Sequence, residues 1–73
     1  MKIAIIISQT NPETVWNVFR LANFTLKQGD EVKIFLIGEG VEYEQSSSEK
    51  FNIAEETTEF LKSDKAHILA CGT

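Results

Sequence analysis

The sequence predicts an α/β fold in which helices connect the strands of a parallel sheet. Three short apolar segments occur near residues 2–8, 32–37 and 66–71, and each is short enough to be a strand. Two segments with apolar residues at helical spacing lie between them. An order in which strands and helices alternate is typical of parallel sheets with right-handed crossovers. With 73 residues, the chain has room for a single small domain over residues 1–73.

The first strand is expected over Lys2–Ser8, where isoleucine predominates. A nearly continuous apolar run is typical of a strand that is buried on both faces. The run is too short to be the apolar core of a signal peptide, and no small-residue cleavage site follows it. No apolar stretch reaches the roughly 20 residues that a membrane span needs. The sequence therefore predicts a cytoplasmic protein without a membrane segment.

The first helix is expected to begin after Asn11, which is a good N-cap, with Pro12 in the first helical position. Gly29 is expected to end it as a left-handed cap. Phe24 falls on the side opposite the apolar stripe and is expected to be exposed. The stripe is expected to consist of Val15, Val18, Phe19, Ala22 and Leu26, widened by Trp16 and Leu21.

The second strand is expected over Val32–Ile37, and a tight turn at Gly38–Gly40 closes it. A polar segment follows over residues 41–50, in which Tyr43 is expected to pack. Asn52 and Glu55 have the spacing of a capping box and predict the start of a second helix. That helix is expected to carry Ile53, Ala54, Thr57, Phe60 and Leu61. The third strand is expected over Ala66–Cys71.

Right-handed crossovers leave two strand orders open. In the order 3-2-1 both helices cover one face of the sheet, and the other face is bare. In the order 2-1-3 the helices cover opposite faces, and each covers half. A parallel sheet is rarely stable when it is uncovered. We therefore expect the chain to be the front part of a longer domain, incomplete at its C-terminal end, or to be covered by another subunit.

The candidate site lies where the three strands end, since ligands bind at that edge of parallel sheets. Cys71 is the one cysteine of the chain and is expected there as a sulfur nucleophile. A nearby helix N-terminus lowers the pKa of a thiol and so favours the reactive thiolate. The alternative, that Cys71 is a small buried core residue, stays open. The residues expected to contact a substrate are Asn11, Gly38, Glu39, Gly40, Gly72 and Thr73.

Several other chemistries are not expected. His67 precedes Cys71 by four strand residues, or about 13 Å, which places it at the opposite edge of the sheet. The two side chains therefore cannot form a catalytic pair or share a metal ion. Gly38–Gly40 lacks the third glycine of a dinucleotide-binding motif and follows the wrong strand. The loop after the first strand has no glycine, so a nucleotide or flavin is disfavoured. No metal and no cofactor are expected.

Charge and cysteine content limit the partners. The formal net charge is −4, and the seven Lys and Arg residues are scattered. Proteins that bind nucleic acid cluster such residues against phosphates, so this class of partner is not expected. One cysteine cannot form an internal disulfide, and no oxidising compartment is implied.

Four segments together resemble a known family across all 73 residues. They are Lys2–Ser8, Phe35–Val41, Glu49–Ile53 and, most specifically, Ile68–Thr73. In their content and order they resemble the DsrE/DsrF-like family of small sulfur-relay proteins, in particular its short archaeal and bacterial members.

The resemblance implies a three-layer α/β/α fold with a parallel sheet. It also implies that Cys71 carries sulfane sulfur as a persulfide and that the chain passes it between donor and acceptor proteins, usually as a homo- or hetero-oligomer. Relatives often have a second cysteine soon after the Gly-Thr pair, followed by a further helix and strands. This chain stops first, so CxxC-type disulfide chemistry is not implied. The alternative function is a non-catalytic, oligomeric binding or scaffold domain with a structural Cys71.

Overall fold

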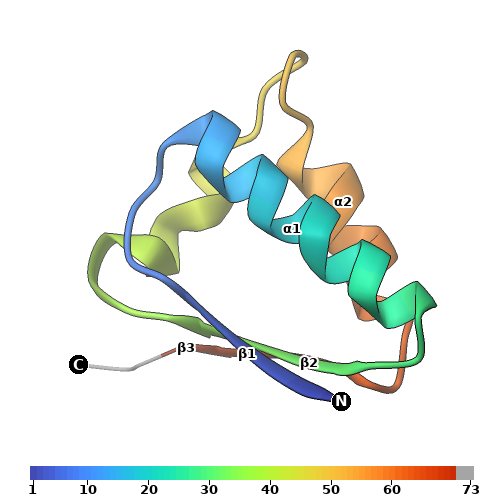
Figure 1. Cartoon of the computed structure of the whole chain (residues 1–73). Helices are drawn as coiled ribbons and strands as arrows, with labels where there is room; N and C mark the ends of the chain where they lie inside the picture. Colours follow the sequence, from blue (N-terminus) through green and yellow to red (C-terminus); the bar gives the residue numbers. More distant parts are fainter. Residues whose placement is uncertain (71–73) are drawn as a thin grey trace.

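A parallel sheet carries its helices on a single face (Figure 1). The computed structural model describes residues 1–70, except for the side chain of Ser46. The elements in chain order are β1 (Lys2–Ile7), α1 (Pro12–Lys27), β2 (Glu31–Leu36), the 3₁₀ helix η1 (Gly38–Ser46), α2 (Ile53–Leu61) and β3 (Ala66–Ala70). The α/β class and the β-α-β-α-β order expected from the sequence are confirmed.

The three strands are arranged in the order β1-β2-β3, and all neighbours are parallel. The register places Ile5, Ile34 and Ile68 in one row across the sheet. Both crossovers run in the same direction, so right-handed connections put α1 and α2 on the same side. Of the two orders that the sequence left open, the structure has the one with a bare face.

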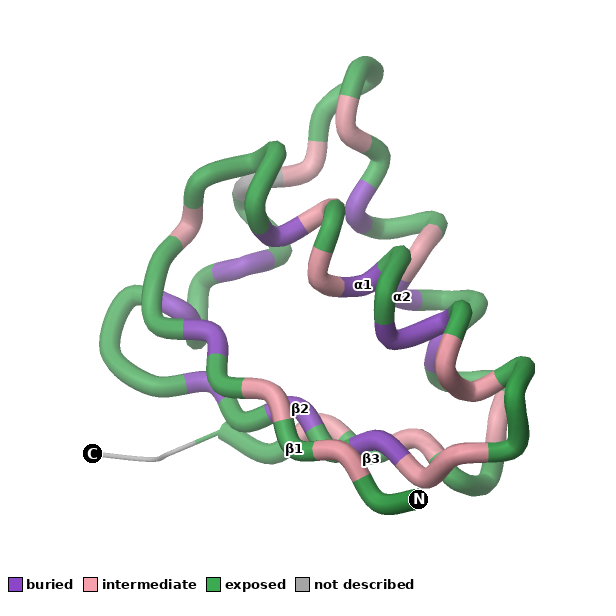
Figure 2. Tube along the Cα trace, viewed as in Figure 1, coloured by how far each residue is buried: buried purple, intermediate pink, exposed green. Residues whose placement is uncertain are grey.

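The expectation that β1 is buried on both faces is wrong. Burial alternates along the strand: Ile3, Ile5 and Ile7 face the helices, whereas Lys2, Ala4 and Ile6 are exposed (Figure 2). The reason is the strand order, which leaves no helix to cover the second side. We call this side the bare face, and its exposed residues are Lys2, Ala4, Ile6, Lys33, Phe35, His67 and Leu69.

Aromatic side chains form the centre of the core between the helices and the sheet. Phe19 and Phe60 meet edge to face with ring centroids 5.7 Å apart, and Tyr43 stacks on Phe19 at 5.4 Å. Trp16, expected in the core, lies at its margin, where its ring packs on Phe51. Further fully buried residues are Val15, Ala22, Val32, Ile34 and Ile53.

The apolar stripe differs from the expected one at its flanks. Leu21 is 57% exposed, and Leu61 and Ala54 are also exposed. Asn23 is buried in place of Leu21, because α1 turns the side of Phe19 and Asn23 toward α2. Phe24 is exposed as expected.

The helix ends form as the sequence predicts. The Thr14 amide donates to Asn11 Oδ1 at 3.0 Å, and the Glu55 amide donates to Asn52 Oδ1 at 3.0 Å. Gly29 follows α1 with φ +92°, which is the left-handed conformation that glycine adopts most easily. These caps satisfy amide and carbonyl groups that have no partner inside the helix.

Candidate functional site

Three chain segments meet at the carboxyl edge of the sheet, where the strands end. They are the loop 8–11 after β1, the start of η1 after β2, and the end of β3 at Ala70 (Figure 1). Cys71, Gly72 and Thr73 follow Ala70 and lie outside the described residues. The candidate site therefore consists of the first two segments and the strand end from which Cys71 continues.

Asn11 lies at this edge, and its side chain caps α1. Its Oδ1 accepts the Thr14 amide, and the residue is exposed. The other amides of the first turn of α1 carry the positive end of the helix dipole. The site therefore gains a positive partial charge from backbone groups, and Asn11 contributes by fixing where the helix begins.

The Gly38–Gly40 segment contains two glycines in different settings. Gly38 is exposed, has φ +54°, and has no atom within 4 Å of where a Cβ would stand. Gly40 is buried, and a Cβ there would collide with the carbonyl group of Ile7. The Gly40 amide donates to the Ile37 carbonyl at 2.9 Å, and the Ile37 amide donates to the Ile7 carbonyl at 3.0 Å. Gly40 thus holds η1 against β1, while Gly38 and the exposed Glu39 face solvent.

A cleft of about 300 Å³ opens between the loop after β1 and η1. Thr10, Pro12, Glu42 and Gln45 line it. Glu42 and Gln45 were not expected at this site, because residues 41–50 have the composition of a polar loop. The buried Tyr43 was the available signal, since an aromatic side chain in a polar segment packs inward and turns its neighbours outward.

The described part of this edge is acidic. Residues 8–11 and 38–46 contain Glu39, Glu42 and Glu44 and no Lys or Arg. Burial raises the pKa of the Tyr43 phenol, and the Glu44 carboxylate raises it further, since the phenol lies 3.4 Å from Glu44 Oε1. A bound anion at this edge is thus supported by the N-terminus of α1 and opposed by the glutamates.

His67 lies away from this edge. It is the second residue of β3, pairs in register with Lys33, and is exposed on the bare face. Within residues 1–70 there is no group of three or more His, Cys, Asp or Glu side chains placed to hold a metal ion. Within the same residues no helix has both the length and the apolar character to cross a membrane.

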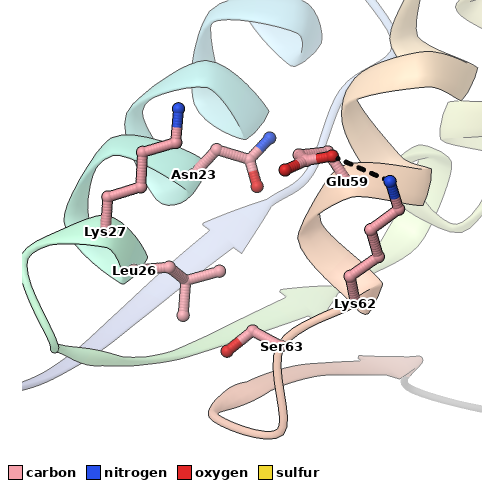
Figure 3. Close-up of a pocket in the computed structure, with 6 residues that line it drawn as sticks. All are labelled: Asn23, Leu26, Lys27, Glu59, Lys62 and Ser63. Carbon is pink, nitrogen blue, oxygen red and sulfur yellow. Dashed lines mark hydrogen bonds and ion pairs between the residues drawn. The ribbon is translucent and has the colours of Figure 1, made fainter.

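A second cleft, of about 260 Å³, lies between the C-terminal halves of α1 and α2 (Figure 3). Asn23 is only 8% exposed there. Its amide donates to the Glu56 carbonyl at 3.0 Å and to Glu56 Oε1 at 3.1 Å, which joins the two helices. The other lining residues are Leu26, Lys27, Glu59, Lys62 and Ser63, with Lys62 paired to Glu59 at 3.2 Å. This cleft is not part of the carboxyl-edge site.

Comparisons with protein-family models, with curated proteins and with solved structures found no match to this chain. A function for the chain therefore has to be inferred from its residues and from their placement in the fold.

Proposed function

We propose that this chain is a cytoplasmic sulfur-relay protein, which carries sulfane sulfur as a persulfide on Cys71 and passes it to a thiol of a partner protein. The observation that carries the proposal is the end of β3. Ala70 lies at the carboxyl edge of a parallel sheet, in register with Leu36 just before η1, and Cys71 is the next residue. The resemblance of Ile68–Thr73 to the DsrE/DsrF-like motif supports the same role.

The transfer needs two exchange steps. In the first, the Cys71 thiolate attacks the outer sulfur of a donor persulfide, a new S–S bond forms, and the donor leaves as a thiolate. In the second, an acceptor thiolate attacks the outer sulfur on Cys71, and the Cys71 thiolate is released. Each step breaks one S–S bond and forms another, so no external oxidant, metal or cofactor takes part.

The described residues at the carboxyl edge of the sheet leave room for a partner protein to approach, and they supply one source of positive charge. Gly38 has no side chain and is exposed, which leaves room for the cysteine of another protein. The N-terminus of α1 favours a thiolate at this edge. Glu39 and Glu42 disfavour it, so neither is given a catalytic role. The donor, the acceptor and a second copy of the chain are the partners that this function requires.

The test is the intact mass of the native protein after incubation with a persulfide donor. We expect a gain of one sulfur that a reductant removes and that a Cys71→Ala variant does not show. Circular dichroism of both proteins is the matched control for folding. Because the chain has one cysteine, any sulfur retained by the variant would contradict the proposal. So would an unmodified thiol in wild-type protein that circular dichroism shows to be folded.

The second candidate function is a non-catalytic binding or scaffold domain. Its supporting observation is the apolar row of the bare face, in which Ile6, Phe35 and Leu69 are neighbours in register and are 65%, 37% and 45% exposed. Exposed apolar patches mark interaction sites. A folded, associated protein whose thiol does not accept sulfur would favour this function.

A further inference from the structure

The side-chain amide of Asn23, in the cleft between α1 and α2, has hydrogen-bond partners on one side only. Its nitrogen donates to the Glu56 carbonyl and to Glu56 Oε1. Both partners are acceptors, so the nitrogen has to face Glu56 and the oxygen has to face away from it. Asn23 Oδ1 is buried and has no hydrogen-bond partner among the described residues. Buried polar atoms of native proteins are nearly always hydrogen-bonded, so this oxygen indicates a place for the donor group of a ligand.

The Glu59 carboxylate is a second acceptor at the same place. Figure 3 shows the Asn23 amide oxygen and the Glu59 carboxylate turned toward the same space between the two helices. Both helices also end beside this space, α1 at Lys27 and α2 at Leu61, and the C-terminal end of a helix carries a partial negative charge. An ammonium group has three donors and a positive charge, so it matches these surroundings.

Lys62 adds the opposite charge to the cleft. Its Nζ lies 3.2 Å from Glu59 Oε2, and the Lys62 and Glu59 side chains are 69% and 54% exposed. An exposed ion pair of this kind contributes little to stability, so it opens at little cost. A ligand with an ammonium group alone would bind Glu59 and leave Lys62 without its partner. A ligand that also has a carboxylate can pair with both side chains.

The spacing of these charges and the size of the cleft limit the ligand further. Because the charged ends of Glu59 and Lys62 lie together, the ammonium and the carboxylate of the ligand have to be close to each other, as they are in an α-amino acid. Leu26 is partly buried and forms an apolar part of the lining. The cleft of about 260 Å³ is smaller than the roughly 300–1,000 Å³ of pockets for drug-sized ligands, which favours a small molecule.

We propose that the cleft between α1 and α2 binds a small aliphatic α-amino acid. The exposed Glu59 side chain rotates to admit the ligand, whose ammonium group donates to Asn23 Oδ1 and to the Glu59 carboxylate. The Lys62 ammonium donates to the ligand carboxylate, and the aliphatic side chain contacts Leu26. Binding replaces one ion pair with two and leaves none of these charges unpaired. Cys71 takes no part, so this site does not depend on the proposed sulfur relay.

The first experiment is a titration of the whole isotope-labelled chain with L-leucine, followed by two-dimensional amide NMR spectra. We expect saturable shifts with a dissociation constant in the millimolar range, since each exposed charge pair contributes little. The shifts should be largest for the Asn23 side-chain amide and for the backbone amides of Glu59, Lys62 and Ser63. The Asn23 signals report on the oxygen directly, because a donor at Oδ1 changes the electron density of the same amide group.

Two analogues of L-leucine each lack one charged group. Isocaproate has the carboxylate without the ammonium, and it should bind at least about tenfold more weakly, because the buried Asn23 oxygen and Glu59 both lose their donor. Isopentylamine has the ammonium without the carboxylate. It should bind about threefold more weakly than L-leucine, because only the exposed pair with Lys62 is lost.

Three variants separate the roles of the charged side chains. Glu59→Gln should weaken the binding of L-leucine at least about threefold. Glu13→Gln makes the same change of charge at an exposed position in the first turn of α1, away from the cleft, and should leave the dissociation constant unchanged. Lys62→Met should abolish the difference in affinity between L-leucine and isopentylamine. All three positions are exposed, so the variants should fold.

Shifts centred on the cleft, together with weaker binding in Glu59→Gln but not in Glu13→Gln, support the proposal. The absence of shifts at about 50 mM L-leucine, well above the expected dissociation constant, would overturn it. Isocaproate that binds as tightly as L-leucine would show that the lysines alone hold an anion. Isopentylamine that binds more tightly than L-leucine would show a site for simple cations, and either result contradicts an amino-acid site.

Discussion

At the scale of single residues, Gly38 and Gly40 show that two nearby glycines can be required for different reasons. Gly38 needs glycine because of its backbone, with φ +54° in open space. Gly40 needs it because of a neighbour, since the Ile7 carbonyl occupies the place of a Cβ. A side chain can rotate away from a new methyl group, whereas the backbone of β1 cannot move without disturbing the sheet.

We expect Gly40→Ala to lower the free energy of unfolding by about 3 kcal/mol, as overpacking against a fixed backbone does. Gly38→Ala is the matched variant and should cost about 1 kcal/mol, from the left-handed backbone alone. Urea unfolding followed by circular dichroism measures both. Equal losses in the two variants would show that η1 shifts away from Ile7 at little cost.

At the scale of elements, the stability of α2 depends most on the cap at its N-terminus. It has nine residues, fewer than an isolated helix needs to be stable in water. Its tertiary anchors are Ile53, Thr57 and Phe60, all on one side. The Asn52 cap and the bond from Asn23 to Glu56 fix its start and its position against α1.

Replacing the cap should therefore reduce stability measurably. We expect Asn52→Ala to lower the free energy of unfolding by about 1 kcal/mol, because the Glu55 amide loses its acceptor. Asn52→Ser keeps a side-chain oxygen in place and should remain within about 0.5 kcal/mol of the original chain. Thermal unfolding distinguishes them, and a serine variant as unstable as the alanine variant would contradict the capping role.

At the scale of the whole molecule, Tyr43 connects the elements. Its ring stacks on Phe19 of α1. Because Tyr43 is a residue of η1 and belongs to the core, it anchors η1 there. Its pKa is raised in the folded state by burial and by Glu44. Unfolding exposes the phenol and returns its pKa to about 10. The unfolded state therefore ionises first as the pH rises, and the folded state loses stability above about pH 10.

A Tyr43→Phe variant should lose less stability than the original chain between about pH 9 and about pH 11. The comparison is needed because lysines titrate in the same range in both proteins. Urea unfolding at the two pH values gives the difference directly. Identical losses in the two proteins would mean that Tyr43 does not ionise differently in the folded and unfolded states.

Much of the fold was predictable, because local signals set it. Asn11 and Asn52 cap their helices through bonds to residues three positions away, so a short stretch of sequence contains both partners. The strand order was not predictable, since right-handed crossovers allow either order. Burial of Asn23 depended on the rotation of α1 against α2, and no local pattern records that rotation.

The carboxyl edge of the sheet was predictable, and the residues that line the cleft there were less so. Parallel strands necessarily end at one edge, so the loop at Asn11 and the start of η1 were expected together there. The cleft beside Glu42 and Gln45 depends on η1, which forms where the sequence predicts a tight turn followed by a polar segment. Gly40 was expected to contact substrate, whereas its burial against Ile7 gives it a packing role.

The consecutive order of the strands also bears on how the chain acquires its structure. Within the described residues each strand pairs with the one that precedes it in the sequence, so pairing does not have to wait for a distant segment. The paired residues are still far apart in sequence, with 29 positions between Lys2 and Glu31 and 34 between Val32 and Ala66. Parallel pairing over such separations is slow to form, so the order of synthesis matters. During synthesis from the N-terminus, β1, α1 and β2 can dock before α2 and β3 have emerged. The Ile-rich β1 would then be held on one side early, which shortens the time in which it could recruit an unrelated nascent chain.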